Sequence, residues 1–458
     1  MSDWGCFNGS DALHNASFMA GDDGHWCCNN WEAKQILSNP DMRKNISLVA
    51  CGVLILFTYF TTSCSHTKDP FSPNVIPLES TVGNYHLLNL SDYVTEIRYI
   101  PLETTESNLM GEIKQIVYED EKIVVSDKHN SCYLFDNDGN LFCKVGSEGR
   151  GPNEYLIINH LMICDGFIFL NDRSKVIIYD TSGRLVENIN LRSPEMPTEY
   201  YIRNVLPLKK DTFVMDVVTY NNEYCPAAVL FASHLSNAKP IKEYPSNVKL
   251  NKVISGGFSV NEEAKMYRFK DEIRTYKFIN CDTLFTIGQD MEMKEAFIFE
   301  LGRFKPTTAY LEWRDRSSGG FIRPEVFFES LSHLFIIFNF GKYAPEPFKY
   351  VFTFPGSDPR ERINSNVCGV FDKSLGKLTL MRQPIKEKLG FKNDIDNGPV
   401  LWPHYISSNN ELVTYITAEE FFEYYGKIEK PTPQMIELSK RIAIDDNPIA
   451  IVAKLKTH

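Results

Sequence analysis

The sequence predicts an all-β protein, a six-bladed β-propeller with a short C-terminal helical insertion and a terminal strand that closes the ring. Two observations support this prediction. From residue 85 onward, short β-branched or aromatic runs alternate with Gly, Asn and Asp turns, and no clear amphipathic helix interrupts the next hundred or so residues. A strand pattern also recurs at a spacing of roughly 45 residues, which is typical of one propeller blade.

The repeat is clearest between residues 116–146 and residues 161–189. The matching positions are Asp127 and Asp172, Asp136 and Asp180, and Gly139 and Gly183. In each unit, an Asp-Gly or Ser-Gly corner supplies the positive φ angle that a tight hairpin turn needs. Because one four-stranded blade cannot bury both of its faces alone, several blades must stack around a central axis.

Later blades are less regular. Paired strand signals recur in residues 211–231, 266–288, 330–354 and 367–381. In the last of these segments, Asp372 and Gly376 match the corner of the earlier repeats. Six blades with insertions fit the length of the chain better than seven or eight.

Residues 417–443 break the strand pattern. Thr417 and Glu420 have the spacing of a capping box, and apolar residues follow at helical intervals, which predicts a helical insertion. Residues 448–454 again have the pattern of a strand, and we expect this strand to pair with one between residues 85 and 100. Such pairing would close the ring and remove two exposed sheet edges.

Residues 42–63 have the three-part layout of a bacterial lipoprotein signal peptide. Two basic residues precede an apolar run at 46–60, and a short polar stretch leads to Cys64. Cys64 occupies the position of a lipobox cysteine, which is acylated and becomes the mature N-terminus, although Thr61 stands where an aliphatic residue is usual. The apolar run is shorter than the roughly 20 residues of a membrane span, so a cleaved signal is favoured over an uncleaved anchor helix.

This layout divides the chain into four parts. We interpret residues 1–41 as a mis-assigned start or a disordered leader, and residues 64–84 as a flexible tether rich in Pro, Ser, Thr and Asn. Residues 85–458 would form the propeller. We therefore expect an exported, membrane-anchored lipoprotein of the cell envelope, placed in the outer membrane, with the face of that membrane left open.

The charge of the chain argues against a nucleic-acid partner, and the positions of two cysteines leave a disulfide open. The formal net charge is -11 and no long Lys or Arg tract occurs, so the sequence has no footprint for nucleic acid. Cys132 and Cys143 flank a predicted hairpin turn and can face each other in a disulfide. Single buried thiols on strands are the favoured interpretation of these cysteines.

Four segments together carry a resemblance to a known family. They are PLETTESNLMGEI at 101–113, GSEGRGPNEY at 146–155, NDIDNGPVLWP at 393–403 and DDNPIAIVAKLK at 445–456. With the signal peptide, they resemble a family of secreted bacterial six-bladed β-propeller lipoproteins, close in blade pattern to the NHL-type and TolB-like propellers. The resemblance implies a propeller, a membrane tether and an envelope location, and it transfers no catalytic residue.

The sharpest local motif is GRGPNEY. Its two glycines and its proline impose a tight loop after a strand, and this loop is interpreted first as a connector between blades. As a second interpretation, it is a rim loop that contacts a ligand through Arg150, Asn153, Glu154 and Tyr155. Trp402 is the other candidate ligand contact, for stacking on a sugar, although core packing is favoured for it.

Asn393, Asp394 and Asp396 are the candidate metal ligands. Their oxygen atoms suit calcium, although Asx-rich turns usually satisfy their own backbone amides. No other cofactor is predicted. The common hydrolase and nucleotide-binding motifs are absent from the sequence, and His129 and His160 would meet in a pocket only if the fold brought them together.

The sequence therefore favours a binding or scaffold module over an enzyme. Its contact surface would be the axial pocket or the rim loops, its ligand an unidentified protein or glycan, and its other partner the membrane that holds the lipid anchor. Two alternatives stay open. One is a calcium-dependent hydrolase of the lactonase or esterase kind, and the other is a carbohydrate-sensing partner of an uptake system.

Overall fold

The computed structural model describes residues 74–457 apart from 152, 173, 199, 210, 220–227, 235–236, 245–263, 278–281, 306–319 and 353–357. The described residues belong to one compact unit. The predicted leader, the signal peptide and Cys64 lie outside the described residues, as does the first part of the predicted tether.

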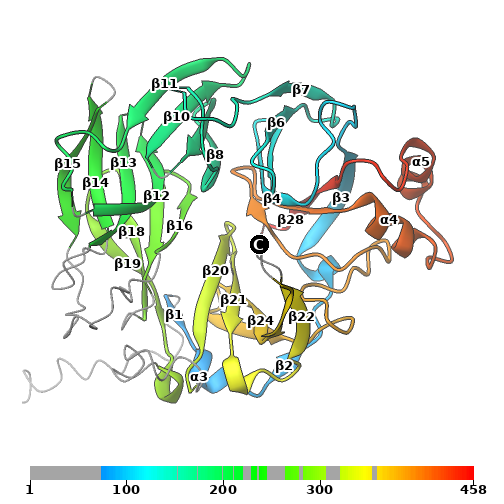
Figure 1. Cartoon of the computed structure of the whole chain (residues 1–458). Coiled ribbons are helices and arrows are strands. Elements are labelled where there is room, and N and C mark those ends of the chain that lie inside the picture. Colours follow the sequence, from blue (N-terminus) through cyan, green and yellow to red (C-terminus); the bar gives the residue numbers. More distant parts are fainter. Residues whose placement is uncertain are drawn as a thin grey trace, which may run out of the picture. The chain divides into compact units, whose positions relative to one another are not determined.

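The described residues form an all-β structure whose sheets are arranged around a centre in the manner of a propeller (Figure 1). The first sheet has four strands, β4–β7: Ile113–Glu119, Lys122–Asp127, Cys132–Phe135 and Leu141–Lys144. An eight-stranded sheet follows. Its first half is β8–β11: His160–Cys164, Phe167–Asn171, Lys175–Asp180 and Leu185–Asn190. Its second half is β12–β15: Tyr200–Lys209, Thr212–Thr219, Ala228–His234 and Asn237–Tyr244. The halves join through one parallel pair, Asn190 with Asn237.

Two five-stranded sheets each carry an outer strand from the N-terminal part of the described chain. The first comprises β16–β19 and β1: Lys265–Phe269, Glu272–Tyr276, Thr283–Ile287, Met293–Phe299 and Val75–Ile76. The second comprises β20, β21, β24, β25 and β2: Arg323–Glu329, His333–Asn339, Asn366–Asp372, Lys377–Met381 and Tyr85–His86. Both β1 and β2 pair in parallel with their neighbours, β19 and β25. A separate hairpin, β22–β23, spans Phe348–Phe352 and Arg360–Asn364.

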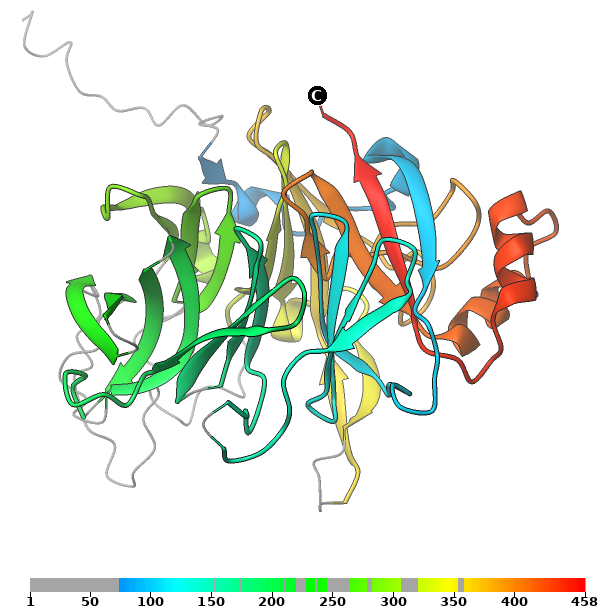
Figure 2. The ribbon, with the colours of Figure 1, turned by 90° about the horizontal axis from the view of Figure 1, so that it is seen from above.

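The last sheet confirms the predicted closure by a terminal strand. It comprises β26, β27, β28 and β3: Tyr405–Ile406, Glu411–Ile416, Ile449–Leu455 and Val94–Pro101. The C-terminal strand β28 pairs antiparallel with β3, so strands from both ends of the described chain share one sheet (Figure 2). This pairing joins the two ends of the ring and pairs edges that would otherwise be exposed.

The predicted helical insertion is also confirmed. Helix α4 spans Ala418–Tyr425 and helix α5 spans Pro433–Arg441. The Thr417 hydroxyl accepts a hydrogen bond from the Glu420 amide at 3.0 Å, as the capping box predicts. The other helices among the described residues are one short α-helix, α3, and three 3-10 turns, η1, η2 and η5: Leu78–Thr81, Leu90–Asp92, Gly302–Phe304 and Gly341–Tyr343. None of the helices in the described part of the chain has the length and apolar character that a membrane crossing requires.

The hairpin corners of the repeat have the geometry that their sequence predicts. Gly139 has φ of 87° and Gly183 has φ of 78°, values that favour glycine. Asp136 Oδ1 accepts hydrogen bonds from the amides of Asp138 and Asn140, each at 2.9 Å. The aspartate therefore holds the turn together, and the glycine allows its backbone conformation.

The innermost strands make a closed succession of contacts. Strand β4 contacts β8, β8 contacts β12, β12 contacts β16, β16 contacts β20, β20 contacts β26, and β26 contacts β4. Apolar side chains fill the layers between neighbouring sheets. Val124 and Leu134 of the first sheet, for example, share a buried cluster with Leu161 and Ile177 of the next one. These layers form the core that holds the sheets around the axis.

One predicted boundary and one predicted strand pair differ from the structure. Residues 75–81, assigned to the flexible tether, form β1 and α3, because Ile76 and Leu78 are fully buried in the cluster that underlies the sheets of β16–β19 and β20–β25. Residues 330–354 do not form one strand pair. Strand β21 pairs with β20 and β24, whereas β22 pairs with β23 in a separate hairpin inserted between β21 and β24.

Candidate functional site

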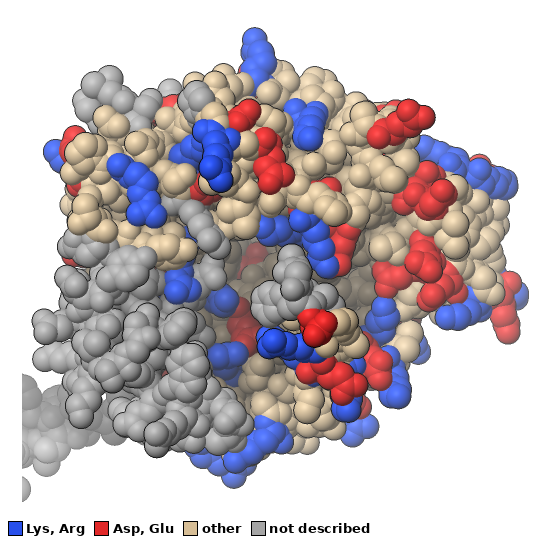
Figure 3. Space-filling view, in the orientation of Figure 1, with Lys and Arg blue, Asp and Glu red and all other residues tan. Residues whose placement is uncertain are grey.

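A cavity of about 640 Å³ lies where the innermost strands converge. Residues of β4, β8, β12, β16, β20 and β26 all contribute to its lining. The space-filling view shows a hollow near the middle of the molecule, with acidic and basic side chains around it (Figure 3). We call this space the axial cavity. It has the size and the central position of a ligand site in such a fold.

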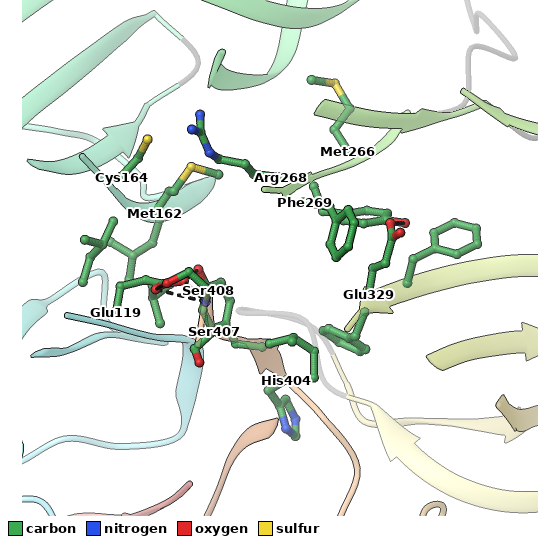
Figure 4. A pocket seen from close by; sticks show the side chains of 18 of the residues that line it. Glu119, Met162, Cys164, Met266, Arg268, Phe269, Glu329, His404, Ser407 and Ser408 are labelled. Carbon is green, nitrogen blue, oxygen red and sulfur yellow. Dashed lines mark hydrogen bonds between the residues drawn. The ribbon is translucent and has the colours of Figure 1, made fainter. Parts of the chain in front are cut away.

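The lining of the axial cavity mixes apolar and charged side chains (Figure 4). Met162 comes from β8, and Met266 and Phe269 come from β16. Two carboxylates, Glu119 and Glu329, lie on different sides of the view. Each of these carboxylates is the last residue of an innermost strand, β4 or β20, so the strand ends position both of them at the cavity. A ligand held here would meet apolar surface and polar groups together.

Glu119 is held by neutral donors. Its side chain accepts hydrogen bonds from the Tyr405 hydroxyl at 2.7 Å, from the Ser408 amide at 2.8 Å, and from the Ser408 hydroxyl. Burial raises the pKa of Glu119, while the bonds from Ser408 and Tyr405 oppose that rise. Tyr405 lies in β26 and Ser408 follows that strand, so these bonds also tie the first sheet to the last.

Glu329 is instead held by cations. Arg274 Nε donates to Glu329 at 3.0 Å, Lys373 Nζ donates at 2.7 Å, and the Tyr267 hydroxyl donates at 2.9 Å. The Glu329 side chain is only 1% exposed, which makes this a buried ion-pair network. Burial lowers the pKa of Lys373, although the nearby Glu329 favours its charged form. The network joins β16 and β17 to the sheet that contains β20.

Three other polar groups at the cavity, Arg268, Cys164 and His160, have internal partners or are neutral. Arg268 donates to the carbonyls of Pro207 and Leu208 at 3.0 and 3.2 Å, and so links β16 to β12. Burial raises the pKa of the Cys164 thiol to about 12 and lowers the pKa of His160 to about 4, so both groups are uncharged near neutral pH. His129 does not line the cavity, so it does not meet His160 there.

The predicted rim loop does not line the axial cavity. Arg150 and Asn153 are exposed, and Glu154 accepts a hydrogen bond from the Gly151 amide at 2.7 Å within the loop itself. Tyr155 is fully buried in the cluster between the first two sets of strands. The burial of Tyr155 argues against the second interpretation, in which it contacts a ligand, and supports the connector interpretation of the loop.

Trp402 also packs in the core. Its ring stacks on Phe391, with centroids 5.5 Å apart, and meets the edge of Phe335 at 5.9 Å. The residue is 8% exposed and is absent from the lining of the axial cavity. Its indole is therefore used for packing between sheets, as the favoured interpretation expected, and presents no open face for a sugar.

The candidate metal ligands point to separate partners. Asn393 Oδ1 accepts from the amides of Ile395 and Asp396, and Asp394 accepts from the amide and the hydroxyl of Ser91. Asp396 accepts from the Tyr99 hydroxyl at 2.9 Å. Within the described ranges, no group of three or more His, Cys, Asp or Glu side chains is placed to hold a metal ion. The calcium site stays a prediction.

The thiols of Cys132 and Cys143 are both free, so the structure does not contain the disulfide that their positions allowed. Cys132 lies opposite Ser126, and Cys143 lies opposite Leu134, so the two cysteines are not cross-strand partners. Cys132 is fully buried, as the favoured interpretation expected.

The carboxylates of the cavity were not predicted from the sequence. Each follows an apolar strand and precedes a turn, in YED at Glu119 and FES at Glu329. That pattern is typical of an ordinary hairpin corner. A comparison of the last residues of equivalent strands across the repeats could have found these carboxylates. Equivalent strand ends of a propeller face the same axis.

A family model matches residues 73–454, nearly the whole of the described chain. The chain belongs to the family described as Domain of unknown function (DUF4934). This DUF4934 family is distinct from the NHL-type and TolB-like propellers that the blade pattern resembles. No curated protein matches the sequence.

One solved structure supports the fold of this DUF4934 member. The chain is similar to a Bacteroides fragilis protein that is named as an exported protein, with 16% identity and a TM-score of 0.56, over 81% of this chain and 98% of that one. A member of the DUF4221 family from Bacteroides vulgatus gives 12% identity and a TM-score of 0.45, over 80% and 98% of the two chains. At these identities, the first similarity shows a shared fold, and the second carries no argument.

Proposed function

We propose that this protein is a six-bladed β-propeller that binds a ligand in its axial cavity as a lipid-anchored module of the cell envelope. Six blades are supported by the strand order, because the eight-stranded sheet consists of two four-stranded halves joined through a single residue pair. The other four blades are the remaining sheets with four core strands each. The succession of contacts from β4 through β26 and back to β4 agrees with this count.

The observation that carries the binding role is the axial cavity. It receives residues from all six innermost strands, and its charged side chains Glu119, Glu329 and Arg268 are held in place by bonds within the protein. Such a preformed site loses little freedom when a ligand binds. The ligand would be an unidentified small molecule, glycan or protein segment with both apolar and polar groups.

Ligand retention tests this proposal. We would purify the full chain from its native host membrane in mild detergent and compare its intact mass under native and denaturing conditions. The native mass is expected to include a bound molecule that denaturation releases. Met162→Trp should fill part of the cavity and reduce the bound fraction at least roughly tenfold, which corresponds to about 1.4 kcal/mol.

Leu156→Trp is the matched control, because Leu156 is 53% exposed and lies outside the cavity lining. This variant should keep the bound molecule. Arg150→Ala and Asn153→Ala test the rim-loop alternative. Loss of the ligand in these rim variants, with full retention in Met162→Trp, would transfer the binding role from the cavity to the rim. Thermal unfolding of each variant separates lost binding from lost folding.

Export and lipid anchoring rest on residues 42–64 of the sequence and on the name of the similar Bacteroides fragilis protein. In the native host, mass spectrometry of the N-terminus should find acylated Cys64 as the first residue. Cys64→Ser should move the protein from the membrane fraction to a soluble or unprocessed form. An unmodified Cys64 in a protein that remains membrane-bound would favour an uncleaved anchor helix instead.

Two alternative functions stay predictions. A calcium-dependent hydrolase would bring a bound divalent ion through purification, and a metal assay of the purified protein would detect it. A carbohydrate-sensing partner of an uptake system would retain a glycan in the experiment above. We give both a lower rank than a binding or scaffold role, because no contact in the described part of the chain specifically favours either of them.

A further inference from the structure

Glu119 is a buried carboxylate of the axial cavity whose charge is not balanced by a cation of the described residues. Its hydrogen-bond donors there are neutral: the Tyr405 hydroxyl and the amide and hydroxyl of Ser408. Within the described ranges Glu119 forms no ion pair, whereas Glu329 at the end of β20 pairs with two cations. Burial of a carboxylate without a cation is costly, so a cation that enters the cavity would offset part of this cost.

The Glu119 side chain also retains an acceptor site. A carboxylate offers about four lone-pair sites, whereas Tyr405 and Ser408 together supply three donors. Glu119 lines the cavity and is only 8% exposed. A donor bound in the cavity can therefore reach this carboxylate, while most of the surrounding water is excluded.

Other acidic side chains lie close to Glu119 in the lining. Asp120 directly follows it, and Asp165 directly follows β8, the innermost strand that contacts β4. Both aspartates are exposed. Burial raises the pKa of Glu119, and the charge of Asp120 adds to this rise. The electrostatic potential on this side of the cavity therefore favours a cation.

The basic side chains of the lining lie away from Glu119 or have partners of their own. Lys114 is the second residue of β4 and Glu119 is the last, so they are about 16 Å apart along the strand. Lys265 and Lys270 belong to β16 or directly follow it, and β16 lies opposite β4 in the closed succession of innermost strands. Arg268 is held by two backbone carbonyls and by an aspartate.

The cavity wall also offers apolar surface. Leu331 and Val326 line the cavity and are 47% and 38% exposed, and Met162 and Met266 belong to the same lining. Side chains of this kind contact the apolar part of a ligand, and the volume of about 640 Å³ suits a small molecule. The site therefore combines an apolar wall with a carboxylate that lacks a cation among the described residues.

We propose that the ligand of the axial cavity is a small organic amine, whose ammonium group binds Glu119 and whose apolar part packs on this wall. The inference rests on the proposed function, because it assigns the chemistry of the ligand in the same cavity. The ammonium group would donate to the open acceptor site and supply the missing positive charge. A metal ion suits the site less well, because within the described ranges no three His, Cys, Asp or Glu side chains are grouped to hold one.

Calorimetric titration of the purified, exhaustively dialysed full chain tests this inference. The probes are n-hexylammonium, 1-hexanol and hexanoate, which share an apolar chain and differ in charge. We expect n-hexylammonium to bind at least roughly tenfold more tightly than either other probe. Glu119→Gln should remove this preference. Glu361→Gln is the matched control and should keep it, because Glu361 is 67% exposed and lies outside the cavity lining.

Two further variants locate the probe and guard against a folding defect. Met162→Trp should weaken the binding of n-hexylammonium, because it fills part of the cavity. If Glu119→Gln does not fold, Ser408→Ala decides the role of the carboxylate. It removes one neutral donor and leaves the charge of Glu119 in place, so the preference for the ammonium should stay or increase. Thermal unfolding of each variant shows whether it is folded.

The outcomes separate this inference from the proposed function. The molecule that denaturation releases from the native protein should react with an amine-specific reagent. A released molecule without an amine, or equal binding of n-hexylammonium and 1-hexanol, would overturn the inference and leave the binding role intact. A preference that survives in folded Glu119→Gln, or is lost in folded Ser408→Ala, would also overturn it. A protein that retains no molecule and binds no probe would instead overturn the proposed function, and this inference with it.

Discussion

Glu119 and Glu329 occupy corresponding places in two different sheets, yet their surroundings differ. Both are buried carboxylates at the last residue of an innermost strand, and both line the axial cavity. Glu119 accepts hydrogen bonds from hydroxyls and an amide, whereas Glu329 also accepts them from Arg274 and Lys373. Equivalent positions of the fold therefore hold a buried carboxylate either with neutral donors or with cations. The stability of the protein should respond differently when Glu119 or Glu329 loses its charge.

The largest loss of stability is expected when Glu329 loses its charge. Glu329→Gln leaves the Arg274 and Lys373 cations buried without their shared carboxylate, and it should reduce the free energy of unfolding by about 3–5 kcal/mol. Denaturant unfolding followed by tryptophan fluorescence measures this loss. Glu361→Gln, at a side chain that is 67% exposed, is the control and should change little. A loss no larger than that of Glu119→Gln would remove the distinction between the two sites.

A smaller effect is expected at Glu119. Glu119→Gln retains the shape of the side chain but turns one oxygen into a donor that faces the donors of Tyr405 and Ser408. Because no buried cation is left unpaired, the loss should be about 1–3 kcal/mol. The same denaturant measurement at neutral pH gives this value. A loss above that of Glu329→Gln would show that the neutral donors matter more than the cations.

The pH dependence of the free energy of unfolding should report the burial of Glu119. The pKa of Glu119 is raised by burial, so between the ordinary carboxyl pKa and its raised value the folded state binds more protons than the unfolded state. This contribution makes the free energy of unfolding decrease as pH rises through that window. Glu119→Gln should remove the contribution, which unfolding midpoints across the acidic range would show. Superimposable pH profiles for wild type and variant would argue against it.

The smallest effect is expected for Tyr405→Phe. This change removes one neutral donor to Glu119 and leaves both bonds from Ser408 in place. We expect a loss of about 1 kcal/mol, together with a further rise in the pKa of Glu119, because the lost bond favoured the charged form. Thermal unfolding at acidic and neutral pH would detect both changes. A loss comparable to that of Glu119→Gln would assign most of the site's stability to this single bond.

Much of the local structure of this fold could be predicted from the sequence. The corner glycines Gly139 and Gly183, the cap at Thr417 and the closing strand at the C-terminus were all predicted, because each leaves a signal within a few residues or recurs at a fixed spacing. The β22–β23 hairpin was missed, since its strands resemble any other pair until their partners are known.

The candidate functional site depends on contacts between residues that are far apart in the sequence, and local sequence patterns do not predict such contacts. The GRGPNEY motif was the strongest local signal, yet Tyr155 is a core residue, because a conspicuous loop sequence does not reveal which way its aromatic side chain points. Glu119 and Tyr405 meet only because the ring closes and brings the first and last sheets together.

The sequence by itself determined the all-β class, the repeating unit, the hairpin corners and the helix cap at Thr417, because periodicity, turn residues and helix caps act over short distances along the chain. Only the tertiary structure decided which strand ends surround the axial cavity and which partners hold each carboxylate there. Those partners lie far apart in the sequence, and only the packing of the sheets around one axis brings them within hydrogen-bonding distance.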